Sequence, residues 1–135
     1  MNLRFSISEL CIIQDPEYRI PIEIADKILY HIGVVLPIRN IMGCPIWASQ
    51  NSGYRPYEYE KRQGRSGNSE HVFHGMGAID WTTEKKRVEE LRDLLERSEY
   101  KRVCWYPDKH FIHCDFKGDD KVYFECYDGI NWVKK

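Results

Sequence analysis

The sequence has 135 residues, 42% of them apolar or aromatic, which fits one globular domain with a proper core. Lysine and arginine number 20 against 21 acidic residues, and the net charge of −1 disfavours a protein that binds nucleic-acid phosphates. No apolar run approaches the ~20 residues of a membrane span, and the start, MNLRFS, lacks a signal-peptide pattern. We therefore expect a cytoplasmically made monomer with no membrane span.

The cysteines are five in number and form no CxxC pair. An odd count without such pairs argues against a disulfide framework and against a four-cysteine zinc site. We expect free, buried thiols in a reducing compartment.

Helical patterns dominate the start of the chain. Ser6 or Ser8 can cap a short helical turn. Pro21 suits the first turn of a helix, and the apolar residues that follow recur at helical spacing. They predict one long helix or two abutting helices over 21–42, ended by Gly43.

The middle of the chain alternates between strands, a loop and a helix. Residues 45–50 and 77–81 predict two short strands. Between them, 51–68 is polar, rich in tyrosine and punctuated by glycine, which is typical of an ordered functional loop. An apolar stripe with a polar opposite side predicts a helix over 83–98, with Thr82-Thr83 as its N-cap.

The residue patterns in the last third of the sequence predict only strands. Two are expected at 101–106 and 110–116. Asp128-Gly129 is a type I′ turn signal between two apolar runs, so 117–135 predicts a hairpin, which we interpret as structural rather than as a substrate-binding flap. The predicted fold class is α+β, with two or three helices packed on a central antiparallel sheet.

Strand 110–116 has one polar face and one apolar face. Because side chains alternate along a strand, Phe111, His113 and Asp115 share one face, opposite apolar neighbours that we assign to the core. An imidazole and a carboxylate therefore lie together on the side away from the core.

A second imidazole–carboxylate pair lies earlier in the chain. His71 precedes strand 77–81, and Asp80 lies on it. If this strand neighbours 110–116, His71, Asp80 and His113 meet. Two imidazoles and one carboxylate are typical ligands of a catalytic zinc ion, which keeps a fourth position for water. We expect such a site on one face of the sheet.

Several motifs follow one another in a fixed order between residues 5 and 116. They are Phe5-Ser-x-Ser-Glu-Leu10, Pro37-Ile-Arg39, Gly43, Pro45-Ile46, Ser52-Gly-Tyr-Arg55, Ser69-x-His71, Gly77-Ala-Ile-Asp80, Tyr106-Pro107 and Phe111-Ile-His-x-Asp115. In this order they resemble the zinc D-Ala-D-Ala carboxypeptidase and L-Ala-D-Glu endopeptidase family. The resemblance is closest to its small phage-type branch of cell-wall hydrolases.

The resemblance implies roles for individual residues. His71, Asp80 and His113 match the family's three zinc ligands, and Ser69 matches a serine that orients the loop. Arg55 matches an arginine that holds a substrate carboxylate or the developing oxyanion, a task suited to a permanently charged, forked donor.

Arg55 also has a structural alternative. An ion pair with Glu58 or Glu60 would explain the residue without any catalytic role.

One departure from the family concerns the ligands. His71 and Asp80 stand two positions farther apart than is usual in the family, and His74 between them is a competing ligand.

Another departure concerns the general base. Many members have an acid three residues before the last histidine, where this chain has His110. His110, Asp108 and Asp115 are therefore all candidates for the catalytic base. Asp115 has a second interpretation, in which it holds the His113 imidazole from behind.

The expected function is Zn²⁺-dependent hydrolysis of an amide bond in peptidoglycan stem peptides. The enzyme would be a phage endolysin or a virion-associated lysin that reaches the bacterial wall after release. One alternative is a catalytically decayed, zinc-stabilised module that binds the wall or a virion partner. Another is a D-Ala-D-Ala carboxypeptidase or dipeptidase.

Overall fold

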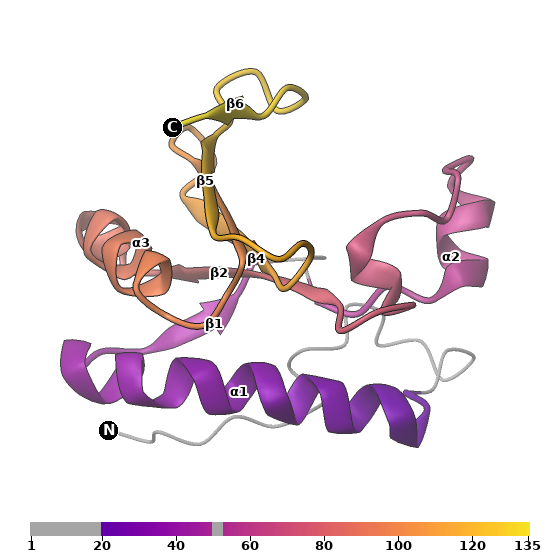
Figure 1. Ribbon diagram of the computed structural model, residues 1–135, viewed down its shortest axis with the longest axis horizontal. Helices are drawn as coiled ribbons and strands as arrows, with labels where there is room; N and C mark the ends of the chain where they lie inside the picture. The colour runs from indigo at the N-terminus through magenta and orange to yellow at the C-terminus, as the bar shows by residue number, and fades with distance from the viewer. Residues whose placement is uncertain (1–19, 50–52) are drawn as a thin grey trace.

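A computed structural model describes residues 20–49 and 53–135 (Figure 1). The possible caps Ser6 and Ser8, the motif Phe5–Leu10, Cys11 and Ser52 lie outside the described residues. Within these ranges, no helix has the length and apolar character needed to cross a membrane.

From residue 20 onward, a long helix comes first and most of the strands come last. The elements in order are α1 (Ile22–Met42), β1 (Ile46–Ala48), α2 (Tyr57–Arg62), the 3₁₀ turn η2 (Glu70–Val72), β2 (Ala78–Thr83), the 3₁₀ turn η3 (Lys85–Arg87), α3 (Val88–Glu96), β3 (Arg102–Tyr106), β4 (Phe111–Asp115), β5 (Val122–Glu125) and β6 (Val133–Lys134).

The strands of the described residues form a six-stranded sheet in the order β1-β2-β4-β3-β5-β6. Every neighbouring pair is antiparallel except β3 and β5, which run parallel. The predicted α+β class is confirmed, with one parallel pair that the strand pattern did not indicate. After β4 the chain reverses direction, crosses past β3 and adds β5 on the far side of β3, so β5 runs parallel to β3.

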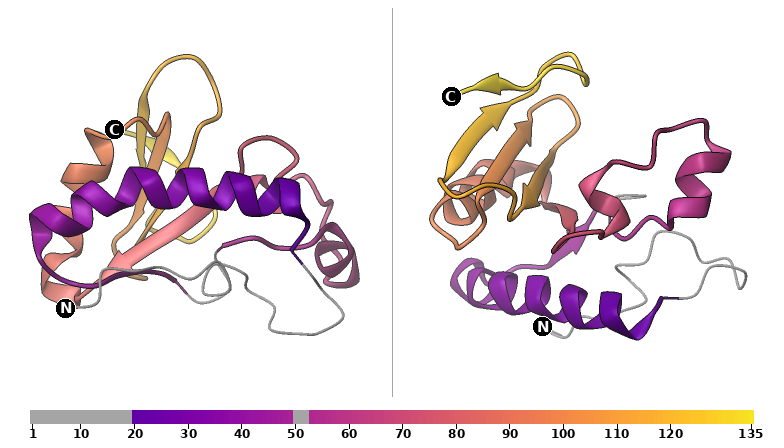
Figure 2. Two further views of the ribbon diagram at one scale, coloured as in Figure 1. Left: turned by 90° about the horizontal axis from the view of Figure 1, so that it is seen from below. Right: turned by 45° about the vertical axis from the view of Figure 1, so that its right-hand side comes forward.

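The core lies between α1, α3 and one face of the sheet. Ile28 and Val35 of α1 and Leu91 of α3 are fully buried in the same apolar cluster as Trp81 of β2 and Ile112 of β4. In the right-hand view of Figure 2, α1 lies at the bottom and the β5–β6 hairpin at the top. Because side chains alternate, the residues between the core residues of β2 and β4 point to the opposite face.

The long helix ends where the sequence predicted. Gly43 has φ of 64°, and its N–H donates to the carbonyl of Arg39 over 2.9 Å, which closes the helix with a left-handed cap. Pro37 lies within α1 and does not divide it.

The predicted start of the second long helix was wrong. Thr82 and Thr83 belong to β2, and α3 begins only at Val88 after the η3 turn. Their hydroxyls bond across the strands, Thr82 to the carbonyl of His110 and Thr83 to that of Pro45. These bonds and the β-branched shape of threonine favour a longer strand over a helix cap.

The loop predicted at 51–68 contains a helix that was missed. α2 starts after Pro56, has Glu58 and Glu60 in its first turn, and ends with Lys61 and Arg62. This charge order complements the helix dipole and could have been recognised in the sequence.

The predicted type I′ turn at Asp128-Gly129 was also wrong. Gly129 has φ of 78°, but Asp128 is not among the described non-glycine residues with positive φ, which this turn requires at both positions. The hairpin instead pairs Phe124 with Lys134 and Glu125 with Val133 across a longer connection.

The cysteines that the structure describes agree with the prediction of free thiols. Cys44, Cys104, Cys114 and Cys126 are buried and unlinked.

Candidate metal centre

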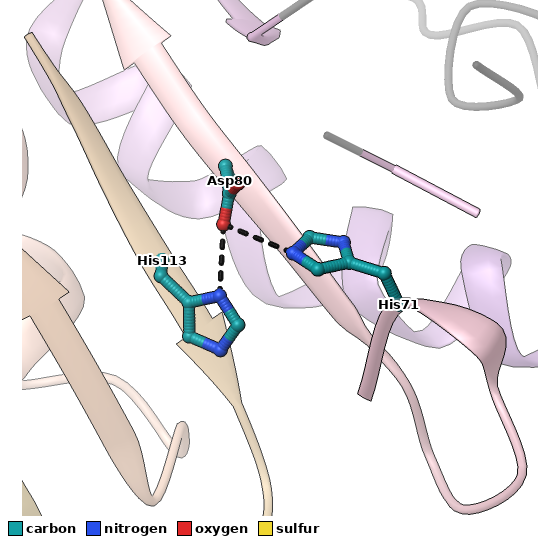
Figure 3. A group of neighbouring side chains, drawn as sticks. All are labelled: His71, Asp80 and His113. Carbon is teal, nitrogen blue, oxygen red and sulfur yellow. Dashed lines mark hydrogen bonds and ion pairs between the residues drawn. The ribbon is translucent and has the colours of Figure 1, made fainter. Parts of the chain in front are cut away.

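Two neighbouring strands and one turn bring three potential metal ligands together. Asp80 of β2 and His113 of β4 are directly paired across the sheet. The η2 turn adds His71, and one ligand atom of each residue lies within 4.8 Å of the others. Asp80 Oδ1 is 2.9 Å from His113 Nδ1 and 3.4 Å from His71 Nε2 (Figure 3). The predicted meeting of the three residues is therefore observed.

The position of His71 depends on two local devices. Ser69 caps η2, because its hydroxyl accepts from the backbone N–H of His71 over 3.2 Å. Nδ1 of His71 lies 2.9 Å from the carbonyl oxygen of Gly53. A proton on Nδ1 can therefore be donated to this carbonyl, which leaves Nε2 free to face Asp80.

His113 is held from behind by a carboxylate and an arginine. Its Nε2 lies 2.7 Å from Asp115 Oδ2. Arg102 donates to both oxygens of Asp115, from Nε over 2.8 Å and 3.1 Å and from Nη2 over 2.6 Å. The backbone N–H of Lys117 adds a further bond to Asp115. Asp115 thus lies in the position expected of a residue that orients a ligand.

Arg102 was not singled out in the sequence. It directly faces Asp115 in the β3–β4 pairing. If the two predicted strands had been joined as a hairpin through the turn at 107–110, this register would have followed.

The charges of this group are strongly coupled. Burial alone would raise the pKa of Asp80, but the His71 and His113 imidazoles hold it well below its usual range. Burial would likewise raise the pKa of Asp115, yet hydrogen bonds from His113 and Arg102 lower it to about 2. Burial disfavours charge on His113, but the Asp115 and Asp80 carboxylates raise its pKa to about 9.

The donor set fits a divalent metal ion. Two imidazole nitrogens and one carboxylate oxygen are the ligand types that zinc uses in catalytic sites. The nitrogens pointing away from the cluster already face hydrogen-bond partners, Gly53 for His71 and Asp115 for His113. Such outer partners are typical of histidines that bind metal. The three residues are only 3–7% exposed, so a bound ion would be largely shielded.

His74 does not join this cluster. It is exposed, and its ring centroid lies 6.0 Å from that of Tyr57. Of the two histidines that the sequence offered, the structure therefore brings His71 to Asp80.

Arg55 lies beside His71 and contacts both the turn and α2. Its backbone N–H donates to the carbonyl of His71 over 2.8 Å, and its Nη2 donates to Ser69 over 3.3 Å. Its Nε also lies 3.5 Å from a carboxylate oxygen of the buried Glu60, which pairs with Arg65 as well. The structural ion pair with Glu60 is thus present, whereas none joins Arg55 to Glu58 in the described part of the chain.

His110 and Asp108 lie in the turn before β4. His110 has φ of 56°, and its carbonyl accepts a bond of 2.5 Å from the Thr82 hydroxyl. Its half-buried imidazole makes no hydrogen bond or ion pair with any residue that the structure describes, and Asp108 is exposed.

A cleft of about 350 Å³ borders the turn that carries His71. Its lining includes Ser69, Glu70 and Lys117, and the last two form an ion pair across 3.6 Å. His71, Asp80 and His113 do not line it, so the cleft lies next to the turn that carries His71 rather than around the cluster.

The sequence model of the family described as Peptidase M15 matches residues 4–115. Searches of curated proteins and of solved structures gave no significant match. The family match covers most of the chain and includes every residue of the His/Asp/His cluster. The chain therefore belongs to the Peptidase M15 family of metal-dependent, D-Ala-D-Ala carboxypeptidase-type peptidases.

Proposed function

We propose that the protein is a zinc-dependent peptidoglycan peptidase that hydrolyses an amide bond of the stem peptide. The observation that carries the proposal is the buried His71, Asp80 and His113 cluster in a chain of the M15 family. A phage endolysin or a virion-associated lysin is the biological role that fits the resemblance to the small phage-type branch.

His71, Asp80 and His113 would hold the metal, which when bound supplies a water of lowered pKa and polarises the scissile carbonyl. Asp115 keeps a proton on Nε2 of His113, so that Nδ1 faces Asp80 and the site. The carbonyl of Gly53 keeps a proton on Nδ1 of His71 in the same way, so that Nε2 of His71 faces Asp80. The two imidazoles are thereby oriented before substrate arrives.

Arg55 would bind the negative charge of the substrate. Its contacts with Ser69 and Glu60 keep the guanidinium next to the turn that carries His71. A stem-peptide carboxylate or a developing oxyanion could use its remaining N–H donors. The ion pair with Glu60 would then serve to aim the arginine.

His110 would act as the general base. Asp115 is fully buried and already accepts from Arg102, His113 and the backbone of Lys117, so it favours an orienting role. The half-buried His110 imidazole makes no such contacts with the described residues, and an imidazole can accept a proton in general-base catalysis. Asp108 is the second candidate, and a comparison of His110→Ala with Asp108→Ala distinguishes the two.

The test is digestion of purified muropeptides, with the products weighed by mass spectrometry. We expect amide cleavage that a chelator stops and added Zn²⁺ restores. His113→Ala should abolish turnover, while the matched control His74→Ala, an exposed histidine outside the cluster, should retain it. Full activity of metal-free His113→Ala would refute the proposal.

The same experiment separates the alternatives. Release of terminal D-Ala alone would identify a carboxypeptidase or dipeptidase. Zinc binding without turnover on any wall peptide would identify a binding module with a decayed site, a reading that the histidine at position 110 in place of an acid motivates.

A further inference from the structure

The C-terminal hairpin places an aromatic ring against the metal cluster. The family match ends at residue 115, yet Trp132 lies with its ring centroid 4.9 Å from that of His113, tilted by 60°. The hairpin that holds Trp132 therefore reaches the face of the sheet that carries the cluster.

The sheet register shows what this ring covers. Asp80, His113, Cys104 and Phe124 are successive partners across β2, β4, β3 and β5, so their side chains share one face. Trp132 contacts His113 and Phe124, which are the two residues that flank Cys104 in this row. The ring centroids of Trp132 and Phe124 are 5.2 Å apart. The indole therefore lies against this row of side chains, from Phe124 to the proposed ligand His113.

Trp132 also contacts the residues that support His113. The guanidinium carbon of Arg102 lies 5.1 Å from the centroid of the indole, within cation–π range. The indole N–H donates to the Tyr106 hydroxyl over 2.6 Å, which fixes the orientation of the ring. One side chain thus touches both ends of the chain of contacts Arg102–Asp115–His113.

The connection before Trp132 is itself well determined. The carboxylate of Asp128 accepts from the backbone N–H groups of Ile130 and Asn131, over 2.8 and 2.7 Å, and from the Asn131 side chain over 2.7 Å. These bonds shape the turn directly preceding Trp132.

We propose that Trp132 is a positioning residue of the metal site, which makes the C-terminal hairpin part of the active centre. The inference rests on the proposed function, because it takes His113 as a metal ligand. The indole shields the Arg102–Asp115 pair from water, which strengthens the contacts that orient His113. It also packs directly on the His113 ring and restricts its rotation. The C-terminal hairpin would then have a functional role, in place of the purely structural one expected from the sequence.

The test is the affinity of the metal-free full chain for Zn²⁺, measured by competition with a chromogenic chelator. Trp132→Ala should lower the affinity by about 10-fold or more, as loss of an outer support does in other metal sites. Trp132→Phe keeps a ring and should stay close to the wild type. Trp47→Ala removes an exposed tryptophan of β1 and should leave the affinity unchanged.

Two further measurements separate positioning from general stability. The visible spectrum of the Co²⁺ form reports ligand geometry, and it should change in Trp132→Ala but not in Trp47→Ala. In a double-mutant cycle, Arg102→Gln and Trp132→Ala should be less than additive in Zn²⁺ affinity, because both act on Asp115 and His113. If Trp132→Ala does not fold, Trp132→Leu takes its place in every comparison.

The outcomes distinguish the inference from the function on which it rests. Wild-type affinity in Trp132→Ala, or strict additivity with Arg102→Gln, would overturn the role of Trp132 and leave the peptidase intact. Absence of metal binding by the wild type would overturn both.

Discussion

Replacing Asp115 with asparagine should weaken both the fold and the metal site. The carboxylate is fully buried, and its neighbours lower its pKa from 3.8 to about 2. A shift of this size favours the ionised form by about 2 kcal/mol, since one pKa unit corresponds to about 1.4 kcal/mol. Asparagine cannot form the charged fork with Arg102. We therefore expect a loss of about 2–3 kcal/mol in the free energy of unfolding of the metal-free protein.

The effect on metal binding should be separate and of similar size. Asparagine can either accept from Nε2 of His113 or donate to it, so the proton is no longer fixed on this nitrogen, and Zn²⁺ affinity should fall by about 10- to 100-fold. Urea unfolding measures the first quantity and chelator competition the second.

Asp93→Asn is the matched control, because Asp93 makes the same kind of ion pair, with Arg92, at the surface of α3. Exposed pairs contribute little, so its stability and metal affinity should stay near wild type. The loss in the free energy of unfolding of Asp115→Asn, relative to the wild type, should be constant above about pH 4 and shrink as the pH falls through about 2. The reason is that the Asp115 carboxyl stabilises the fold only while it is ionised. Equal effects of the two variants, or wild-type zinc affinity in Asp115→Asn, would refute the reasoning.

Three further predictions follow from the same structure. Gly77→Ala should lower the free energy of unfolding by about 1–2 kcal/mol or more, because φ is +84° and the new methyl group would lie 2.2 Å from the Phe73 ring. As a control, Gly33→Ala in α1 adds a methyl group that meets no neighbouring atom and should stabilise the helix by up to about 1 kcal/mol. Equal urea midpoints of the two variants would contradict this. In the metal-free protein, NMR titration should find His31 neutral down to about pH 4, because burial lowers its pKa, and stability should fall between about pH 6.5 and 4; a normal pKa would contradict this. The pKa of His113 is raised, to about 9, so its effect on stability runs in the opposite direction: the stability of the metal-free protein should decline as the pH rises from about 6.5 to 9. Zn²⁺ affinity should increase over the same pH range, because the competing proton is lost. A Zn²⁺ affinity that does not depend on pH would contradict this.

Local patterns allowed several features to be predicted. Helical spacing and a glycine stop defined α1, and strand alternation put His113 and Asp115 on one face. These features follow from backbone geometry over a few neighbouring residues, so distant parts of the chain do not alter them. The order of short motifs was enough to indicate the family.

One prediction failed because distant contacts override local preference, and another because of local hydrogen bonds. Thr82 and Thr83 looked like a helix cap, but their hydroxyls bond to the carbonyls of His110 and Pro45 in neighbouring segments, and the strand continues. A type I′ turn was expected at Asp128-Gly129, but the Asp128 carboxylate accepts from the backbone N–H groups of Ile130 and Asn131 and shapes a different turn there.

The sequence by itself supplied the chemical types at the site, which were two histidines, an aspartate and a nearby arginine. Only the tertiary structure shows that His71, and not His74, lies next to Asp80, because this depends on the η2 turn, its Ser69 cap and the carbonyl of Gly53. The register of β3 with β4 also decided that Arg102 supports Asp115, and the crossover to β5 decided that Trp132 reaches His113. Those contacts join segments far apart in sequence, and no local pattern encodes which of them will pair.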